Sequence, residues 1–154
     1  CFRHIILRTS WVFGSHGNNF LNTMLKLAQK RNIIGVVCDQ NGAPTSANGI
    51  ASTIVSIINQ TYSKNDGWGI YHYSGYPYTS WHSFAEAIFS EAKKQNLLPH
   101  EITLNPISSK QYETPVKRPM NSRLNCNKLK IQFGIEADDW FSQMQSALAK
   151  IKSP

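Results

Sequence analysis

Apolar residues follow two different spacings along the chain. Residues 33–38 and 68–73 are apolar in a short run or at alternate positions, which is typical of strands. The region after Ser80 or Ser83 instead carries apolar residues three and four positions apart, the spacing of a helix that buries one face. Ser83 and Glu86 also stand at the spacing of a capping box. The buried stripe predicted for this helix is Trp81, Phe84, Ala85, Ile88, Phe89 and Ala92.

The same spacings divide the rest of the chain into further strands and helices. Strands are predicted over residues 4–13 and 102–107, and residues 110–122 form a loop that contains prolines. Strands and helices alternate along the sequence, which favours an α/β fold with parallel pairing. The faces predicted to be buried on the other helices are Phe20, Met24, Leu27 and Ala28, then Ile50, Ile54, Ile57 and Ile58, and finally Trp140, Met144, Ala147, Leu148 and Ile151.

The predicted helix ends follow the usual capping chemistry. Asn18 or Asn19 can cap the first helix, because a side-chain oxygen at that position accepts a bond from a free backbone N–H. Asn125 is predicted to cap a short helix that ends at Gly134. The last helix is predicted to match its dipole, with acidic residues in its first turn and lysines in its last. These charged residues are Asp138, Asp139, Lys150 and Lys152.

Composition indicates one globular domain. The chain has 154 residues, of which 41% are hydrophobic and 11% aromatic, enough for a real core. Its longest apolar stretches, such as residues 54–58, are far too short to cross a bilayer. Cys1, Cys38 and Cys126 form neither a metal pair nor a disulfide framework, which favours a reducing, cytoplasmic setting. The opening residues lack an initiator Met and read as the middle of a strand, so we expect a truncated chain.

The net charge of +7 is concentrated in one part of the sequence. Residues 110–130 carry six Lys or Arg side chains against Glu113 alone. A nucleic-acid-binding protein would use such a field for phosphate contacts. A pocket for a sugar nucleotide also needs cations for its pyrophosphate, and many surface lysines are simply solvated.

The glycine patterns do not amount to a dinucleotide-binding fingerprint. Gly14 and Gly17 lie between a strand and a helix, but the third glycine position holds Phe20. Gly67 and Gly69 precede a strand rather than a helix, so both pairs are read as turns. The histidines show no metal-ligand spacing, and no Tyr is followed four residues later by Lys.

Four segments carry candidate binding chemistry. Trp11 lies at the end of a strand, where it could stack on a sugar or base or serve as an ordinary core residue. Asn19 offers an amide at a helix N-terminus, for an anion or for capping alone. Gln40 and Thr45 belong to a turn rich in donors and acceptors. Arg118 stands before a proline, a rigid way to present a phosphate-binding fork or a structural contact.

Taken in order, these segments resemble the dTDP-4-dehydrorhamnose reductase family. The matching strings are Leu-Arg-Thr-Ser-Trp-Val-Phe-Gly from Leu7, Gly-Asn-Asn-Phe from Gly17, Asp-Gln-x-Gly-x-Pro-Thr-Ser from Asp39, Gly-Ile-Tyr-His-Tyr from Gly69 with Ser80-Trp81, and Arg-Pro-x-Asn-Ser-x-Leu from Arg118. Each string is modest alone, but the ordered set runs through nearly all of the chain and is specific.

The resemblance implies an α/β fold made of the last strands of a Rossmann-type parallel sheet and the small C-terminal substrate-binding domain. Residues 1–154 would be the nucleotide-sugar-binding portion of a bacterial, cytoplasmic reductase whose N-terminal cofactor-binding domain is missing. The family reduces dTDP-4-dehydro-β-L-rhamnose to dTDP-L-rhamnose, for lipopolysaccharide and other surface polysaccharides, with NADPH or NADH. Its glycine-rich loop and Tyr-x-x-x-Lys pair precede the Arg-Thr-Ser-Trp string. We therefore expect no catalytic residue here, an inactive fragment, and a cofactor bound mainly by the missing half.

The resemblance also implies a set of site residues. Trp11 would contact the sugar, and some members carry a metal-holding Glu at a place occupied here by Asn48, so no metal is expected. Besides the dTDP-sugar we expect no nucleic-acid and no membrane partner. The strands of residues 4–13 and 68–73 would lack neighbours, so the fragment should self-associate. The residues implied to line the nucleotide-sugar pocket are Asn19, Gln40, Thr45 and Arg118.

Two other functions are compatible with parts of the sequence. Similar motifs occur in a regulatory subunit of methionine adenosyltransferase, which is a binding partner rather than an enzyme. The residues upstream of Cys1 would separate the two functions, because an intact Tyr-x-x-x-Lys pair beside a rhamnose operon would favour the enzyme. A basic nucleic-acid module would interleave aromatic residues with lysines on one surface, whereas the aromatic residues here fall on predicted helical core stripes.

Overall fold

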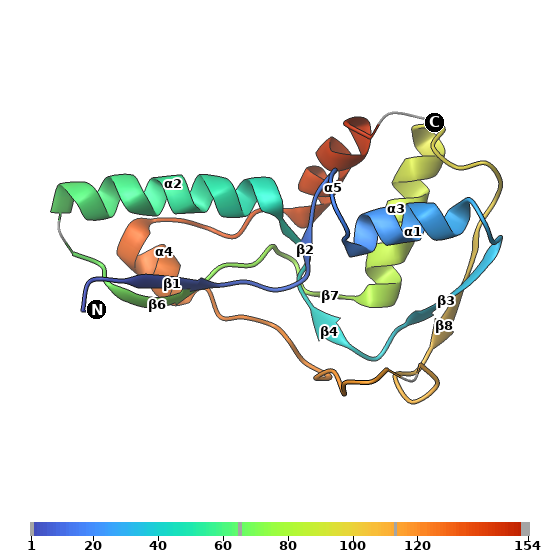
Figure 1. The fold of residues 1–154 in the computed structure, drawn as a ribbon, viewed down its shortest axis with the longest axis horizontal. Coiled ribbons are helices and arrows are strands. Elements are labelled where there is room, and N and C mark those ends of the chain that lie inside the picture. The colour runs from blue at the N-terminus through green and yellow to red at the C-terminus, as the bar shows by residue number, and fades with distance from the viewer. Residues whose placement is uncertain (1, 65, 113, 152–154) are drawn as a thin grey trace.

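The computed structural model describes residues 2–64, 66–112 and 114–151, arranged as two lobes along one long axis (Figure 1). The first lobe contains helix α2 (Ala47–Lys64), helix α4 (Asn127–Phe133) and the strand pair β1 (Ile5–Arg8) and β6 (Gly69–His72). The remaining helices and strands form the second lobe and the connection between them. The chain passes between the lobes several times, so neither lobe is a continuous segment.

The first lobe is a parallel strand pair covered by two helices. Strands β1 and β6 pair in parallel from Ile5 opposite Gly69 to Arg8 opposite His72. One face of this pair packs against α2 and α4, while Ile6 and Ile70 on the other face are about 40–50% exposed. The core of the lobe consists of Ile57, Tyr71, Tyr73, Leu129 and Phe133.

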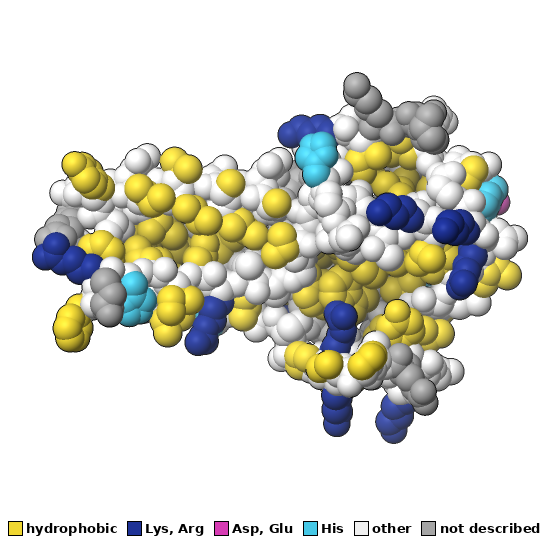
Figure 2. Space-filling model, in the orientation of Figure 1, with side chains coloured by type: hydrophobic (Ala, Val, Ile, Leu, Met, Phe, Trp, Pro, Cys, Tyr) yellow, Lys and Arg dark blue, Asp and Glu magenta, His cyan; other side chains and the backbone are white. Residues whose placement is uncertain are grey.

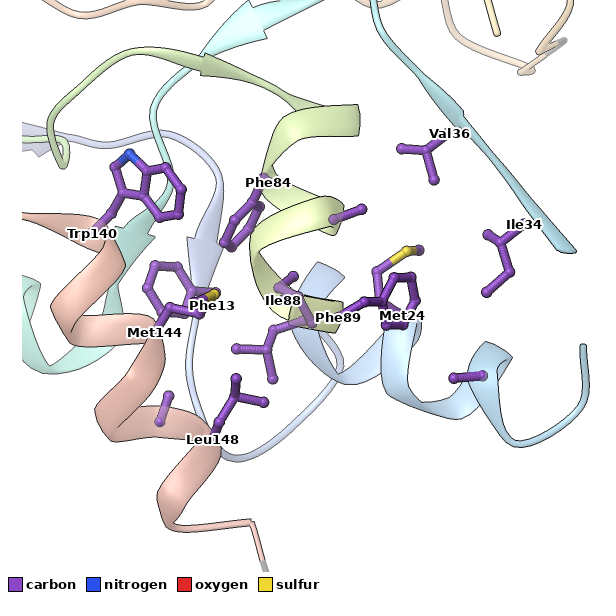
Figure 3. Close-up of a cluster of buried hydrophobic side chains, with 14 residues drawn as sticks. Phe13, Met24, Ile34, Val36, Phe84, Ile88, Phe89, Trp140, Met144 and Leu148 are labelled. Carbon is purple, nitrogen blue, oxygen red and sulfur yellow. The ribbon is translucent and has the colours of Figure 1, made fainter. Parts of the chain in front are cut away.

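The second lobe holds the larger core (Figure 3). Strands β3 (Ile33–Val37) and β8 (Thr103–Ile107) pair in parallel, and the helices around them are α1 (Phe20–Ala28), α3 (Trp81–Lys94) and α5 (Trp140–Ala149). Helix α3 contacts both α1 and α5 and lies at the centre of this lobe. Phe84, Ile88, Met144 and Leu148 meet there with no exposed surface.

Two very short strand pairs connect the lobes. Strand β2 (Val12–Phe13) pairs in parallel with β5 (Thr45–Ser46), and β4 (Asn41–Gly42) pairs antiparallel with β7 (Thr79–Ser80). The predicted α/β class with parallel pairing is confirmed. The predicted strand over residues 4–13 is wrong in one respect, because it is interrupted at Trp11, whose φ of 45° lies in the left-handed region.

The lobes also meet at the buried hydroxyl of Tyr73. This hydroxyl is hydrogen-bonded to Asp138 and Thr53, and its burial raises the pKa of Tyr73 well above its usual range. Gly49 of α2 approaches so closely that an added Cβ would collide with the Asp138 carboxylate and the Tyr73 hydroxyl. The absence of a side chain at Gly49 therefore permits this contact between α2 and the segment leading into α5.

The helix caps confirm some sequence predictions and correct others. Asn19 caps α1, and the predicted helix end at Gly134 is confirmed by its φ of 66°. Helix α3 is capped by Ser80, so Ser83 lies within its first turn. Cys126, rather than Asn125, occupies the N-cap position of α4 without a side-chain cap bond, but Asn125 Oδ1 accepts the backbone N–H of Asn127, the first residue of the helix, at 2.9 Å.

The prediction of acidic residues in the first turn of α5 is wrong. Asp139 is the N-cap of this helix, and Asp138 precedes it, because the Asp139 carboxylate accepts bonds from the backbone N–H groups of Phe141 and Ser142. Lys150 is at the C-cap, and Lys152 lies outside the described residues.

The predicted buried stripe of α2 is wrong for two of its four residues. Ile57 is buried and Ile50 packs partly buried against the same core, but Ile54 and Ile58 are 43% and 58% exposed. The buried line of the helix instead continues through Thr53 and Thr61, which are spaced four residues from Ile57 on either side. Figure 2 shows the resulting apolar patch along α2. No described helix, α2 included, is both long and apolar enough to cross a membrane.

The cap of α5 gives a prediction on stability. Asp139→Ala should lower the unfolding free energy by about 1 kcal/mol, because it removes an N-cap acceptor. Asp139→Asn should lose less, since an asparagine oxygen can still accept the cap bonds. Thermal unfolding of both variants measures the difference, and equal stability of wild type and Asp139→Ala would contradict this account of the cap.

The same cap should depend on pH. Hydrogen bonds from Ser142 and Phe141 lower the pKa of Asp139 in the folded state. Its contribution is therefore present above the unfolded-state pKa and is lost as pH falls through the folded-state pKa. The acid-side loss of stability should be smaller in Asp139→Asn, which cannot titrate there.

Candidate functional site

A cleft of about 1040 Å³ opens in the second lobe between α1, β3 and the loop of residues 109–120. Its volume is at the upper end of the range typical of small-molecule sites. Apolar side chains cover much of this surface (Figure 2). Those that line the cleft include Phe20, Met24, Leu27, Ile34, Val36 and Trp81.

Four cationic residues surround this apolar surface. Arg31 comes from the end of α1, and Lys110, Lys117 and Arg118 come from the 109–120 loop. None of the described residues that line the cleft is acidic. Glu113, which the sequence places in this loop, lies outside the described residues. Positive charge around a concave apolar surface favours an anionic ligand with an apolar part.

Gln40 contributes a buried polar group to the same cleft. The residue is 8% exposed and lines the cleft. The Gln40 amide is not among the buried side-chain atoms that lack a hydrogen-bond partner, which in the described residues are Thr61 Oγ1 and His82 Nε2. An amide that lines a cleft is available to a ligand, to which it can both donate and accept.

The 109–120 loop is fixed to the base of the cleft through Asp39. Both carboxylate oxygens of Asp39 accept the backbone N–H of Ser109, at 2.9 and 3.0 Å, and Oδ2 also accepts the Ser109 hydroxyl at 3.0 Å. The backbone bond from Ser109 is the main reason that the pKa of Asp39 lies below its usual value. The carboxylate thus holds the start of the loop beside the turn that contains Gln40.

Trp11 lies behind the cleft wall rather than along it. Its indole stacks on that of Trp81, with ring centroids 3.6 Å apart and an interplanar angle of 13°. Its Nε1 donates to Ser122 Oγ at 3.0 Å. A non-glycine residue with φ of 45° carries a strain of about 1–3 kcal/mol, which surrounding contacts must maintain.

The other predicted site residues lie at different distances from the cleft. Arg118 lines it and is exposed, so its guanidinium is accessible to a ligand. Asn19 precedes Phe20 of the cleft, and its side chain bonds Gly14 O, His16 O and Asn22 N–H. Thr45 is buried between the lobes, where Oγ1 donates to Ala43 O and accepts from Gly75 N–H. The cleft therefore brings Gln40 and Arg118 together, while direct ligand roles for Trp11, Asn19 and Thr45 stay predictions.

Sequence reasoning missed several residues of the cleft. Trp81 and Phe20 were assigned to helix cores, and both also face the cleft, where their rings meet at 4.6 Å. Arg31 and Tyr112 were not singled out because neither belongs to a recognisable string. The position of Trp81 directly after the cap Ser80 was the one available signal, since the first residue of a helix lies at its exposed end.

The described residues contain no group of three or more His, Cys, Asp or Glu side chains that could hold a metal ion. Asn48, which replaces the glutamate implied by the resemblance, is exposed in the first turn of α2. The absence of a metal remains an expectation from the sequence.

Comparison with known proteins identifies the relatives of this chain. The model of the RmlD substrate binding domain family matches residues 1–153. The chain belongs to this family. It is 45% identical over 152 residues to dTDP-4-dehydrorhamnose reductase from Aggregatibacter actinomycetemcomitans, covering 98% of this chain and 50% of that protein. It is 40% identical over 140 residues to the reductase from Escherichia coli K12, covering 91% and 47%.

Solved structures of RmlD-family proteins show the same architecture. The dTDP-4-dehydrorhamnose reductase from Bacillus anthracis, solved in complex with NADP, is 30% identical and superposes with a TM-score of 0.83, over 95% of this chain and 48% of that one. The orthologue from Clostridium acetobutylicum has a TM-score of 0.82 at 28% identity, over 94% and 48%. The chain thus spans about half the length of the relatives it matches.

The anchoring of the loop gives a second prediction. Asp39→Ala should increase hydrogen exchange at the backbone amides of the 109–120 loop, because the loop loses the acceptor of three bonds. The pKa of Asp39 is lowered in the fold, so the anchor should be fully present above the ordinary Asp pKa and released as pH falls through the lowered, folded-state pKa.

Hydrogen exchange measured by mass spectrometry can test both effects. The control variant is Glu86→Ala, whose side chain is exposed on α3 and has only His82 as a partner. Loop protection that is equal in Asp39→Ala and wild type would show that other contacts hold the loop.

Proposed function

We propose that this chain binds the dTDP-sugar substrate of a dTDP-4-dehydrorhamnose reductase in the cleft of the second lobe. The observation that carries the proposal is the combination of an apolar surface, the Gln40 amide in the cleft lining and four surrounding cations without a described acidic lining residue. These three features match a pyrimidine nucleotide joined to a sugar, which has apolar ring faces, hydrogen-bonding edges and a negatively charged pyrophosphate. Family membership supports the same ligand class.

Different parts of the proposed ligand match different residues of the cleft. The thymine ring and deoxyribose have apolar faces, which match aromatic and aliphatic side chains such as Trp81 and Val36. The pyrophosphate requires cations, and Arg118 can donate two parallel hydrogen bonds to phosphate oxygens. Gln40 can pair with a ligand group that presents both a donor and an acceptor. Trp11 does not line the cleft, so its proposed sugar contact would be made by the part of the half-buried indole that Trp81 leaves open, and Asn19 and Thr45 would support the cleft from behind.

The proposed role in catalysis is to position the substrate. Ketone reduction requires a hydride from NADPH or NADH, which the resemblance assigns mainly to the other half of the reductase. No Tyr-x-x-x-Lys pair occurs in the 154 residues. The residues of this chain would hold the sugar nucleotide in a fixed orientation, and orientation alone accounts for a large part of the rate of such transfers. The whole enzyme would convert dTDP-4-dehydro-β-L-rhamnose to dTDP-L-rhamnose.

Titration of the chain with dTDP by calorimetry tests the proposal. Arg118→Lys should weaken binding about tenfold, because lysine cannot replace a bidentate guanidinium. Arg123→Lys is the matched control, since Arg123 lies in the same segment but over the ring of Tyr78 and does not line the cleft. Equal dTDP affinity for wild type, Arg118→Lys and Arg123→Lys would remove Arg118 from the site, and no dTDP binding by wild type would refute the proposal.

The isolated 154-residue chain should not oxidise NADPH and should self-associate. Within the described residues, β1 and β6 pair only with each other, so each leaves one edge with free backbone groups. Ile54, Val55, Ile58 and Tyr62 of α2 add exposed apolar area. Light scattering should show a dimer or larger species that Ile58→Lys reduces, whereas a stable wild-type monomer at tens of micromolar would contradict the expectation.

A further inference from the structure

We propose that Ser122 is a positioning residue of the cleft, joining the Trp11–Trp81 stack to the loop wall that carries Arg118. The proposal rests on the function proposed above and deepens it. Ser122 itself does not line the cleft. Its effect on a ligand would pass through the residues that it holds in place.

The hydroxyl of Ser122 bridges two parts of the fold. It accepts the indole N–H of Trp11 at 3.0 Å and donates to the backbone carbonyl of Asn41 at 3.2 Å. A hydroxyl has one proton and two lone pairs, so it can serve as acceptor and donor at once. Alanine offers neither group, and the Trp11 N–H would lose its partner.

Backbone bonds place the same residue in register with β4. The N–H of Ser122 donates to Asn41 O at 2.8 Å, and the N–H of Asn41 donates to Met120 O at 2.9 Å. Residues 120–122 are therefore fixed on Asn41 as a short parallel ladder. Arg118 precedes this ladder by two residues, with Pro119 between them, and proline restricts the backbone that links them.

The contact between Trp11 and Ser122 is closely packed against Gly42. A Cβ added to Gly42 would come within 2.5 Å of Trp11 Cε2 and 2.7 Å of Ser122 Oγ. Thr45 donates its N–H to the carbonyl of Trp11 at 3.1 Å, which helps hold the left-handed backbone there. The indole is thus confined between Trp81 on one side and the Gly42–Ser122 contact on the other.

The segments that Ser122 and Trp11 connect both contribute residues to the cleft lining. Trp81 and Phe20 line its aromatic part, and Met120 and Arg118 line the loop wall. A shift of Trp11 against Ser122 would change the separation of these two parts. We therefore expect the Ser122 hydroxyl to fix the spacing between the aromatic surface and the cation that meets the pyrophosphate.

Three variants of the chain test this role by calorimetric titration with dTDP. Ser122→Ala should weaken binding about five- to tenfold, and Ser122→Thr, which keeps the hydroxyl, should recover most of the affinity. Ser146→Ala is the control, because Ser146 also donates to a backbone carbonyl but lies on α5 away from the cleft. Trp11→Phe removes the same N–H from the other side, so its loss and that of Ser122→Ala should be less than additive.

Two further readouts separate positioning from general stability. Ser122→Ala should alter the exciton circular dichroism of the stacked Trp11–Trp81 pair and increase hydrogen exchange in residues 118–122, whereas Ser146→Ala should do neither. If wild type binds dTDP and Ser122→Ala binds equally well, the role of Ser122 is refuted while the proposed function stands. If wild type does not bind dTDP, the proposed function fails. Unchanged dichroism and exchange in Ser122→Ala would then overturn the positioning role independently.

Discussion

The chain leaves β1 and enters β2 through Trp11, whose backbone adopts a conformation that a bulky residue rarely occupies. Its stack on Trp81, its bond to Ser122 and the bond from Thr45 maintain this geometry. The partners come from α3, the 109–120 loop region and β5, which are far apart in sequence. Trp11 therefore contacts three segments that are distant in sequence, and one of its partners, Trp81, lines the cleft.

The sequence predicted those elements whose periodic pattern is long enough to be distinctive. Helix α3 has six apolar positions at helical spacing, and all but Trp81 of that stripe are buried. Caps such as Asn19 and Gly134 were also predictable, because each depends on the chemistry of a single residue. The stripe of α2 was wrong because isoleucines alternate there with small and polar residues, and periodicity alone could not show that Thr53 and Thr61 face the strands.

The candidate site was less accessible to sequence reasoning, for a physical reason. Strands β2, β4, β5 and β7 have two residues each, so no period can reveal them, yet they determine which loops meet. Gln40 could be named from its string, but its largely buried position in the cleft lining is a property of packing. For Trp81, the sequence pattern indicated only part of its role. Its place on an apolar stripe suggested a core residue, and only the arrangement of α1, α3 and the loop shows its second, cleft-facing surface.

The distribution of charge favours binding of a small anionic ligand over binding of a nucleic acid strand. A protein that binds an extended nucleic acid strand places cations along a groove that follows the backbone, with aromatic platforms between them. Here Arg31 and three cations of the 109–120 loop line one concave apolar surface. Such convergence concentrates positive potential over the dimensions of a small ligand, because low-dielectric walls focus the field within a cleft. Three of the six cations in residues 110–130 therefore line the cleft, while Arg123, Lys128 and Lys130 contact Tyr78, Tyr71 and Glu136 elsewhere in the fold.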